Sequence, residues 1–258
     1  MNLVTLTTDY GNRDYYSAAL KAKLIQCSGD IHIVDITHEI TPYHFGSAAF
    51  QVRNALPFFP AGTVHFIDVS FSIDASSPYL IMKHSDQYVV ACDNGVFSLI
   101  LEDTQPQELY RIYSIDLIKH ASYPAIDIFP VVLSAILQNK INTVAEPFDS
   151  IQLAQTQRAI MYDKMIRAGV LHIDHHQNII LNIKRADFEK VGKDKRFVIR
   201  VRRTVEVDTM SQTYAEVSSS NVVAFFNYND YLEIAMNQGN LAALNDVNIG
   251  DTVQIDFQ

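Results

Sequence analysis

Two carboxylates, Asp9 and Asp14, lie five residues apart just after the first apolar run of the chain. An ionised carboxylate can accept hydrogen bonds from two vicinal hydroxyls, which is a common way to hold a ribose diol, and a second carboxylate suits an ammonium group. The same spacing fits two capping roles, with Asp9 in the turn and Asp14 at the start of the following helix. Spacing alone favours the capping interpretation.

A second polar cluster lies at residues 169–178, which include His172, Asp174, His175, His176 and Asn178. His172 and Asp174 fall on one face of an expected strand, whereas His175 and His176 point apart. No further pair with metal-like spacing accompanies them. We therefore expect no bound metal and interpret the cluster as a turn with polar contacts.

The two cysteines do not suggest redox or nucleophilic chemistry. Cys27 and Cys92 form no Cys-x-x-Cys pair, and two thiols cannot build a disulfide framework. Cys92 precedes Asp93-Asn94-Gly95, an expected turn, and we predict a buried structural role for it. The chain also has no Gly-x-Ser-x-Gly elbow, no P-loop and no Gly-x-Gly-x-x-Gly motif.

The first part of the chain, residues 1–150, alternates between β-type and helical patterns. Strands are expected over 3–7, 31–36, 63–69, 79–83 and 88–92, and helices over 17–27, 46–56 and 127–139. This alternation predicts an α/β domain with a partly parallel sheet. Ligands of such sheets bind beyond the carboxyl ends of strands, where Asp9 and Asp68 lie.

The last part, residues 166–258, is predicted to be a smaller all-β, barrel-like domain, because short β-type runs are separated by Asn, Asp, Gly and Ser. Residues 151–165 are the expected linker, and their mixed composition predicts an ordered connection. Residues 184–203 are rich in bases interleaved with acids, and we interpret them as a solvated strand-and-turn face.

Composition limits the partners. The chain has 258 residues, 48% of them hydrophobic, and a formal net charge of −9. An acidic chain repels phosphate backbones, so nucleic acid is not an expected partner. No apolar run reaches the roughly 20 residues needed to cross a bilayer, and the N-terminus lacks the pattern of a signal peptide. We expect a reduced, cytoplasmic protein without membrane partners.

Ordered motifs along the chain resemble those of the S-adenosylmethionine hydroxide adenosyltransferase family, which also contains the fluorinase and chlorinase. Thr7-Thr8-Asp9-Tyr10-Gly11 is similar to the family's opening TTDFG, with Asp14 after it. The other matching segments are VDITHEI at 34–40, FPAGTVH at 59–65, DNG at 93–95, Ile173-Asp174 with Asn178 and Asn182-Ile183, and LEIAMN at 232–237 with Gly239-Asn240.

The resemblance implies a larger N-terminal α/β domain, a C-terminal β-barrel and a homotrimer with ligand sites between subunits. It implies S-adenosylmethionine as the substrate, a small adenosyl ligand, and no separate cofactor. The roles it implies are Asp9 on the ribose hydroxyls, Asp14 and Asp174 facing the methionine ammonium, Asn178 against the ribose, Asn237 in the region that lines the adenine, and Tyr43 near the aromatic cover of the substrate.

The resemblance also implies a reaction in which a nucleophile attacks C5′ of the ribose in line and releases neutral methionine. In hydrolytic members an Asp-Arg-His set manages the water. Asp68 matches the Asp of that set. Residues 73–77 read IDASS where the Arg is expected, and the His position is Pro124, with Ile126 in place of the neighbouring Arg. Losing such groups should slow the reaction roughly a hundredfold or more.

Three functions stay open at this point. The first is an S-adenosylmethionine hydrolase that forms adenosine and methionine. The second is a catalytically impaired adenosyl-binding or structural oligomer, which the altered residues favour. The third is a transferase that uses halide, for which Ser70 and Ser72 could donate hydrogen bonds. His38, His44 and Lys83 are candidates to replace the absent groups.

Overall fold

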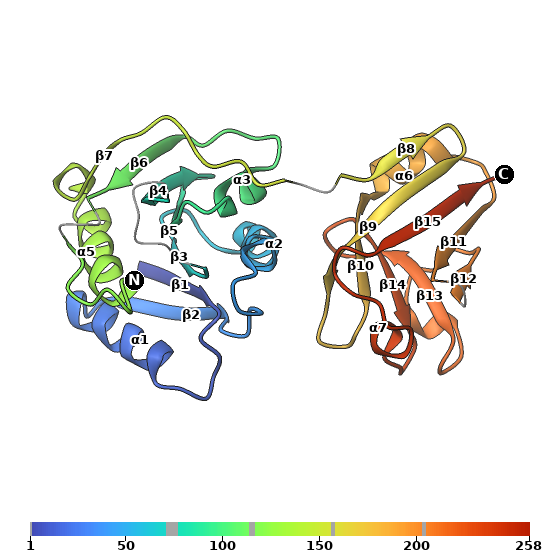
Figure 1. Ribbon diagram of the computed structural model, residues 1–258, viewed down its shortest axis with the longest axis horizontal. Helices are drawn as coiled ribbons and strands as arrows, with labels where there is room; N and C mark the ends of the chain where they lie inside the picture. Colours follow the sequence, from blue (N-terminus) through green and yellow to red (C-terminus); the bar gives the residue numbers. More distant parts are fainter. Residues whose placement is uncertain (1, 71–76, 114–116, 156–157, 203–204) are drawn as a thin grey trace. The chain divides into compact units, whose positions relative to one another are not determined.

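The computed structural model describes residues 2–70, 77–113, 117–155, 158–202 and 205–258. The chain forms two compact units, Met1–Gln155 and Thr156–Gln258, which we call the N-terminal and C-terminal units (Figure 1). Each unit has its own buried apolar clusters. The two-domain architecture expected from the sequence is therefore present.

The N-terminal unit is built on a mixed seven-stranded sheet with the order β2-β1-β3-β5-β4-β6-β7. β2, β1, β3 and β5 run parallel, while β4, β6 and β7 pair antiparallel. The strands are β1 (Asn2–Thr8), β2 (Ile31–Thr37), β3 (Val64–Asp68), β4 (Tyr79–His84), β5 (Gln87–Cys92), β6 (Glu108–Ile112) and β7 (Ala145–Pro147). The sheet is thus partly parallel, as the alternating pattern predicts.

Helices cover both faces of this sheet. α1 (Tyr16–Cys27) packs with α5 (Ala125–Leu137) on one face, and α2 (Phe45–Ala55) packs with α3 (Val96–Leu101) on the other (Figure 1). Two short 3₁₀ turns, η1 (Leu56–Phe58) and η2 (Ile141–Thr143), follow α2 and α5. The buried side of α5 stacks Phe129 on Phe66 of β3, with ring centroids 4.5 Å apart. This packing fixes α5 beside the strand that ends at Asp68.

The parallel strands bring their carboxyl ends to one edge of the sheet. Thr8, the last residue of β1, pairs with Asp68, the last residue of β3. His38 and Asp93 follow the ends of β2 and β5 in the same way. Residues far apart in sequence therefore meet at this edge, where open α/β sheets bind ligands.

The C-terminal unit is a nearly closed, barrel-like antiparallel sheet with the order β12-β11-β15-β9-β10-β14-β13, and β8 pairs with β9. Its strands are β8 (Ile160–Tyr162), β9 (Met165–Ile173), β10 (Ile179–Lys184), β11 (Phe197–Val201), β12 (Val205–Val207), β13 (Val222–Phe226), β14 (Tyr231–Met236) and β15 (Thr252–Phe257). Its short helices are α6 (Arg185–Gly192), η3 (Tyr214–Glu216) and α7 (Leu241–Leu244).

Helix α6 corrects the expectation of a strand-and-turn face over residues 184–203. The ring of Phe188 is buried against Phe197, Phe226 and Phe257. Gly192 lies so close to the Phe257 ring that a Cβ there would come within 1.9 Å of it. The aromatic anchor Phe188 and the close approach at Gly192 hold this helix against the strands of the unit.

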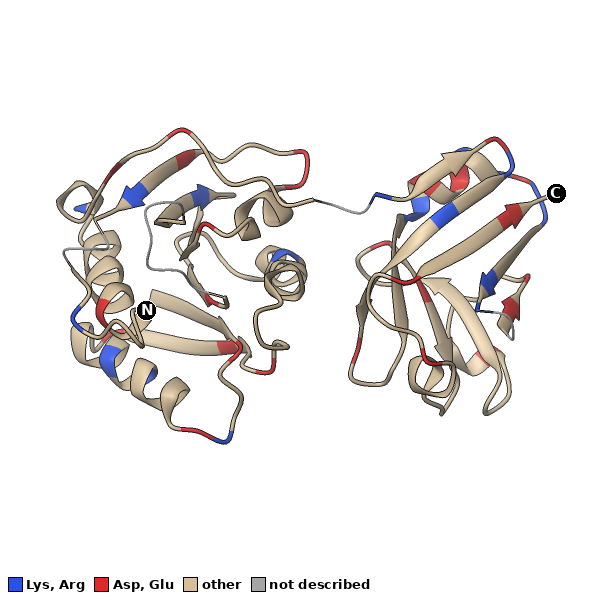
Figure 2. Ribbon diagram, viewed as in Figure 1, with Lys and Arg blue, Asp and Glu red and all other residues tan. Residues whose placement is uncertain are grey.

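Charged residues are spread over both units. In the ribbon of Figure 2, positions of Lys and Arg are interspersed with positions of Asp and Glu in both units. Within the described residues, no helix combines the length and the apolar character that crossing a bilayer requires.

Candidate functional site

Asp9 lies directly after β1, and its side chain is tied to a distant segment. The backbone N–H of Tyr43 donates a hydrogen bond to Asp9 Oδ2 at 3.0 Å. Tyr43 has a positive φ of 67°, and 77% of its surface is exposed. Tyr43 thus combines an uncommon backbone conformation with an N–H that binds the carboxylate, and its side chain is exposed.

The capping roles favoured by spacing are not the ones adopted. The N–H that reaches Asp9 belongs to a residue 34 positions away, so the carboxylate serves a distant segment rather than its own turn. Helix α1 has Tyr15 at its N-cap position, without a side-chain cap, and no acid in its first turn. Asp14 is exposed to solvent in the preceding bend. Asp9 therefore does not cap its own turn, and Asp14 does not cap helix α1.

Asp68 is buried at the end of β3, with 2% of its surface exposed. The hydroxyl of Tyr10 donates a hydrogen bond to Asp68 Oδ2, and the hydroxyl of Tyr79 donates to Oδ1 at 3.3 Å. Burial raises the pKa of the Asp68 carboxyl to about 7, the two tyrosine hydrogen bonds lower it, and the negative charge of Asp9 adds a smaller increase. Near neutral pH this carboxyl is thus poised between its two charge states.

The two phenols remain donors over the whole physiological range. Burial, followed by the negative charge of Asp68, raises the pKa of both Tyr10 and Tyr79 far above its ordinary value. Neither phenol therefore competes with Asp68 for the loss of a proton, and each keeps its hydrogen aimed at a carboxyl oxygen.

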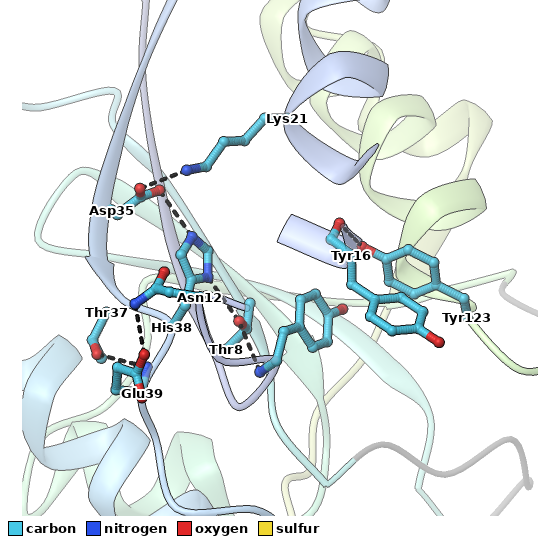
Figure 3. A network of polar contacts seen from close by, with 10 residues as sticks. Thr8, Asn12, Tyr16, Lys21, Asp35, Thr37, His38, Glu39 and Tyr123 are labelled. Carbon is cyan, nitrogen blue, oxygen red and sulfur yellow. Dashed lines mark hydrogen bonds and ion pairs between the residues drawn. The ribbon is translucent and has the colours of Figure 1, made fainter. Parts of the chain in front are cut away.

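An aromatic cluster packs around Tyr10. The Tyr123 ring meets the Tyr10 ring edge-on, with centroids 5.4 Å apart, and the Tyr16 ring lies 6.1 Å from it. The hydroxyl of Tyr123 donates to the backbone oxygen of Tyr16 at 2.7 Å (Figure 3). Tyr123 immediately precedes Pro124, the position expected for the family's His. The rings of Tyr10, Tyr16 and Tyr123 therefore pack together beside Pro124, which stands where the family's His is expected.

His38 anchors the loop after β1. Its Nδ1 lies 2.8 Å from Thr8 Oγ1, and its Nε2 lies 3.1 Å from Asp35 Oδ1, close enough for an ion pair but without hydrogen-bond alignment (Figure 3). Burial lowers the pKa of the His38 imidazole, and Asp35 opposes this. The His38 carbonyl accepts from the N–H of Gly11 at 2.7 Å. His38 thus holds the segment that carries Asp9 and Tyr10.

Asn94 holds the chain that follows Asp68. Its side-chain amide donates to the carbonyl oxygens of Val69 and Ser70 at 2.9 and 3.0 Å. The next residue, Gly95, has a φ of 102°, and a Cβ there would lie 3.0 Å from Ala154. The expected Asp93-Asn94-Gly95 turn therefore also fixes the end of β3. Only the match to a family motif hinted at this role.

The candidates to replace the absent Arg and His are engaged elsewhere. His44 accepts a hydrogen bond from the N–H of Ser47 at the start of α2, and Lys83 pairs with Glu108 at 3.0 Å. Residues 71–76, which include Ser72 and most of the segment where the Arg is expected, lie outside the described residues. Among the described residues, the two phenols are the hydrogen-bond partners of the Asp68 carboxyl.

In the C-terminal unit, Asp174 and Asn178 close the connection between β9 and β10. Asp174 Oδ1 accepts from the backbone N–H of Asn178 at 2.8 Å, and Oδ2 accepts from its side-chain amide at 3.0 Å. Gln177 between them has a positive φ of 65°. The predicted turn with polar contacts is therefore confirmed, and it keeps the Asn178 side chain in a fixed orientation.

A cavity of about 460 Å³ in the C-terminal unit is lined by Asn178, Tyr214, Met236, Asn237 and neighbouring residues. The Asn237 amide donates to the Val217 carbonyl at 2.7 Å, which leaves its side-chain oxygen as an acceptor. Two predicted site residues thus share one cavity. Its size suits a small organic ligand.

Sequence reasoning missed the polar support of this cavity. Glu233 of β14 is 5% exposed, and its two carboxylate oxygens accept from the Tyr214 hydroxyl at 2.6 Å and the Asn227 amide at 3.1 Å. Glu233 stands in the LEIAMN motif, but nothing in its spacing indicates a buried carboxylate. Tyr214 lies in η3, outside any motif.

A second cavity, the cysteine at the end of β5 and the arrangement of metal-type side chains also bear on the predictions. Another cavity, of about 340 Å³ on the surface of α5, contains none of the predicted site residues. Cys92 is buried and its thiol donates to the Ser77 carbonyl at 3.1 Å, as expected of a structural cysteine. Within the described residues, no three side chains of His, Cys, Asp or Glu gather as a metal site requires.

Comparison with family models matches both parts of the chain. Residues 4–145 match the N-terminal domain of the SAM hydroxide adenosyltransferases, and residues 168–254 match the C-terminal domain of the same family. SAM is S-adenosylmethionine. Together the two matches span most of both units.

Relatives with assigned names align over nearly the whole chain. An (R)-S-adenosyl-L-methionine hydrolase of Methanocaldococcus jannaschii is 25% identical, with 99% of this chain and 96% of the relative covered. A protein of the same name from Salinispora tropica is 23% identical, covering 98% and 97%. A fluorinase of Nocardia brasiliensis is 22% identical, covering 98% and 96%.

Two solved structures share the fold. An uncharacterised conserved protein from Thermotoga maritima superimposes with a TM-score of 0.87 at 24% identity, covering 99% of this chain and 100% of that one. A conserved hypothetical protein from Thermus thermophilus gives a TM-score of 0.77 at 22% identity, with both chains fully covered.

Proposed function

Because the chain belongs to the SAM hydroxide adenosyltransferase family, we propose that it hydrolyses S-adenosylmethionine at ribose C5′ to adenosine and L-methionine. The observation that carries this proposal is Asp68, a buried carboxyl at the edge where the parallel strands end, whose pKa is about 7. A general base is most effective when its pKa lies near the working pH. The names of the hydrolase relatives support the same reaction.

The reaction makes few demands on the protein. The sulfonium of the substrate is its own leaving group and departs as a neutral thioether. The protein must align a water with the C5′–S bond, exclude other water, and accept one proton from the attacking molecule. Asp68 is the proposed proton acceptor.

The remaining predicted residues have binding roles in this proposal. Asp9 holds the two ribose hydroxyls, a role supported by its fixed orientation through the Tyr43 N–H. Asp14 and Asp174 attract the methionine ammonium. The uncharged groups complete the pocket, with Asn178 against the ribose, Asn237 beside the adenine, and Tyr43 as an aromatic cover.

We also propose that the chain acts as a homotrimer, as the family resemblance implies. The expected result is a particle of three times the 29.1 kDa chain mass in sedimentation or light scattering. A monomer at assay concentrations would contradict this part of the proposal and leave the chemistry to be tested separately.

One observation favours a second function, the binding of an adenosyl ligand without turnover. Both oxygens of Asp68 already accept a hydrogen bond, and the carboxyl is nearly inaccessible. If the tyrosines did not leave room for a water beside Asp68, the family's ligand would bind but would not react.

The test is an incubation of the purified chain with S-adenosylmethionine containing both sulfonium epimers, with adenosine and methionine quantified by chromatography. We expect equal amounts of the two products, and a loss of about a hundredfold or more in the Asp68→Asn variant. The matched control is Asp149→Asn, the same change at an exposed position. Binding of S-adenosylmethionine in calorimetry without formation of adenosine would favour the second function. Turnover that requires added halide would exclude hydrolysis.

A further inference from the structure

The Asp68 carboxyl is held by two neutral donors from two different elements. Tyr10 follows β1 and donates to Oδ2, while Tyr79 begins β4 and donates to Oδ1. Each carboxylate oxygen can accept two hydrogen bonds, so each oxygen keeps one lone pair that the tyrosines do not use. The arrangement fixes the plane of the carboxyl and still leaves it able to accept a proton.

One of these donors exists because of a single-atom difference. The opening motif reads TTDYG in this chain, where the family motif it resembles is TTDFG. The additional atom is the Tyr10 hydroxyl oxygen, and this hydroxyl is the one that bonds Asp68 Oδ2. The same chain has Pro124 and Ile126 where an ionisable His and Arg are expected. A donor has thus been gained where cationic donors are missing.

The surroundings of Tyr10 keep its hydroxyl in place. Its ring packs against Tyr16 and Tyr123, and its backbone N–H donates to Thr8 Oγ1 at 3.3 Å. Thr8 Oγ1 is in turn held by His38 (Figure 3). A phenol fixed at both its ring and its backbone directs its hydroxyl without a large entropic cost on bond formation.

From this geometry we propose that Tyr10 and Tyr79 are positioning residues that clamp Asp68 as the proton acceptor of the site, in place of the family's cationic groups. This inference rests on the proposed hydrolysis. We call the two phenols and the carboxyl the tyrosine clamp, which consists of Tyr10, Asp68 and Tyr79.

A neutral clamp has a chemical consequence that a cationic one would not have. Two phenols stabilise an ionised carboxylate less than a guanidinium does, so the carboxyl remains a stronger base. The negative charge of the ionised clamp is also left uncompensated by protein cations among the described partners. Such a charge favours the sulfonium cation of the substrate over its two products, neither of which carries a sulfonium.

The proton step balances without any further reactant. The water oxygen forms a bond to C5′, the C5′–S bond breaks, and its electron pair stays on sulfur as a neutral thioether. The proton lost by the water goes to Asp68. Both phenols keep their protons throughout, because their pKa values lie far above that of the carboxyl.

The test compares Tyr10→Phe and Tyr79→Phe with the wild-type chain across pH 5 to 9. Tyr10→Phe keeps the ring packing and removes one hydroxyl. We expect kcat at pH 7 to fall about tenfold or more, KM to change less than about threefold, and the acidic limb of the kcat profile to move to higher pH. The sign follows because a hydroxyl that donates to a carboxylate lowers its pKa, so removing that hydroxyl raises it.

Tyr110→Phe is the matched control. The Tyr110 hydroxyl donates to a carboxylate oxygen of Glu108 at 2.6 Å. The variant therefore removes the same kind of bond, but in β6 and away from the strand end that carries Asp68. This variant should keep the wild-type kcat and pH profile. If Tyr10→Phe also kept them, the clamp would be wrong although hydrolysis would stand.

A second measurement does not depend on activity. The carboxyl carbon of Asp68 can be followed by ¹³C NMR in chains labelled at aspartate, with Asp68→Asn to assign the signal. Its midpoint should move to higher pH in Tyr10→Phe. An unchanged midpoint overturns the clamp even if the wild-type chain forms no adenosine, whereas a shifted midpoint without adenosine supports the clamp and rejects the hydrolysis.

Discussion

In each unit a buried carboxylate of a family-like motif accepts a hydrogen bond from a tyrosine, but these two carboxylates, Asp68 and Glu233, occupy different places in their sheets. Asp68 is the last residue of β3, and both of its donors are phenols. Glu233 lies inside β14, where a phenol and an amide hold it and Phe225 is its cross-strand partner. A carboxyl at the end of a strand can act on a ligand beyond the sheet. The mid-strand carboxyl of Glu233 instead holds Tyr214, which lines the cavity.

This difference suggests a division of labour. In the proposed reaction the N-terminal unit supplies the proton acceptor, Asp68, and the C-terminal unit supplies a cavity whose lining is held by hydrogen bonds. Changes in the carboxyl of the first should alter rate, pH dependence and stability together. Changes in the cavity of the second should alter affinity alone.

The largest effect is expected in the stability of Asp68→Asn. The folded-state pKa of Asp68 is about 7, and its unperturbed value is 3.8. The folded chain therefore holds a proton that the unfolded chain releases, and its stability falls as the pH rises from about 4 to about 7. The penalty at pH 8 is roughly 4 kcal/mol. Asp68→Asn should remove it and raise the unfolding temperature at pH 8 by several degrees, with a smaller gain at pH 5.

Calorimetric scans of both chains at the two pH values measure this effect. The difference between variant and wild type isolates Asp68, because other groups titrate equally in both chains. His65 is such a group, since burial lowers its pKa to about 4 and costs stability in acid. An equal gain at pH 5 and pH 8 would mean that Asp68 is ionised in the folded chain, and the contrast between the units would lose its basis.

A binding effect of intermediate size is expected for Asp9→Ala. The carboxylate is proposed to accept hydrogen bonds from two ribose hydroxyls, and charge-assisted bonds contribute about 1.5–3 kcal/mol each. We expect Kd for S-adenosylmethionine to rise about a hundredfold, which corresponds to roughly 2.7 kcal/mol. Calorimetric titration measures it, with Asp149→Ala as the control. Unchanged binding would place the adenosyl pocket away from the end of β1.

The sequence predicted the strands and helices that carry strong periodic patterns. β1, β2, β3 and α1 lie within a residue or two of their expected ranges. The short elements α3, β7, β8 and β12 were not predicted: each of these three strands has three residues, too few to show alternation, and the six residues of α3 make less than two helical turns. Their existence depends on cross-strand and core contacts that only the folded chain provides.

The site was predictable to the extent that its residues belong to motifs. Asp9, Asp68 and Asn178 were predicted as site residues in this way, and Asp68 lies opposite Thr8 in the sheet register. The partners of these residues were not found. Tyr10 and Tyr79 approach Asp68 across 58 and 11 residues, and no local pattern reports a contact of that kind. Capping was favoured for Asp9 because spacing could not reveal the distant Tyr43 N–H.

The smallest effect is expected for Asn178→Ala in the C-terminal unit. Asn178 is 4% exposed, lines the cavity and is held by Asp174, so its amide is already oriented before a ligand arrives. A lost neutral hydrogen bond costs about 0.5–1.5 kcal/mol, so affinity should fall about tenfold or less. The acidic limb of the kcat profile should stay in place, because the hydrogen-bond partners of Asn178 and those of Asp68 are different residues. Calorimetry and pH-dependent kinetics on one preparation measure both quantities. A shifted limb would show that the C-terminal unit also governs the proton transfer, and the division between rate and affinity would then fail.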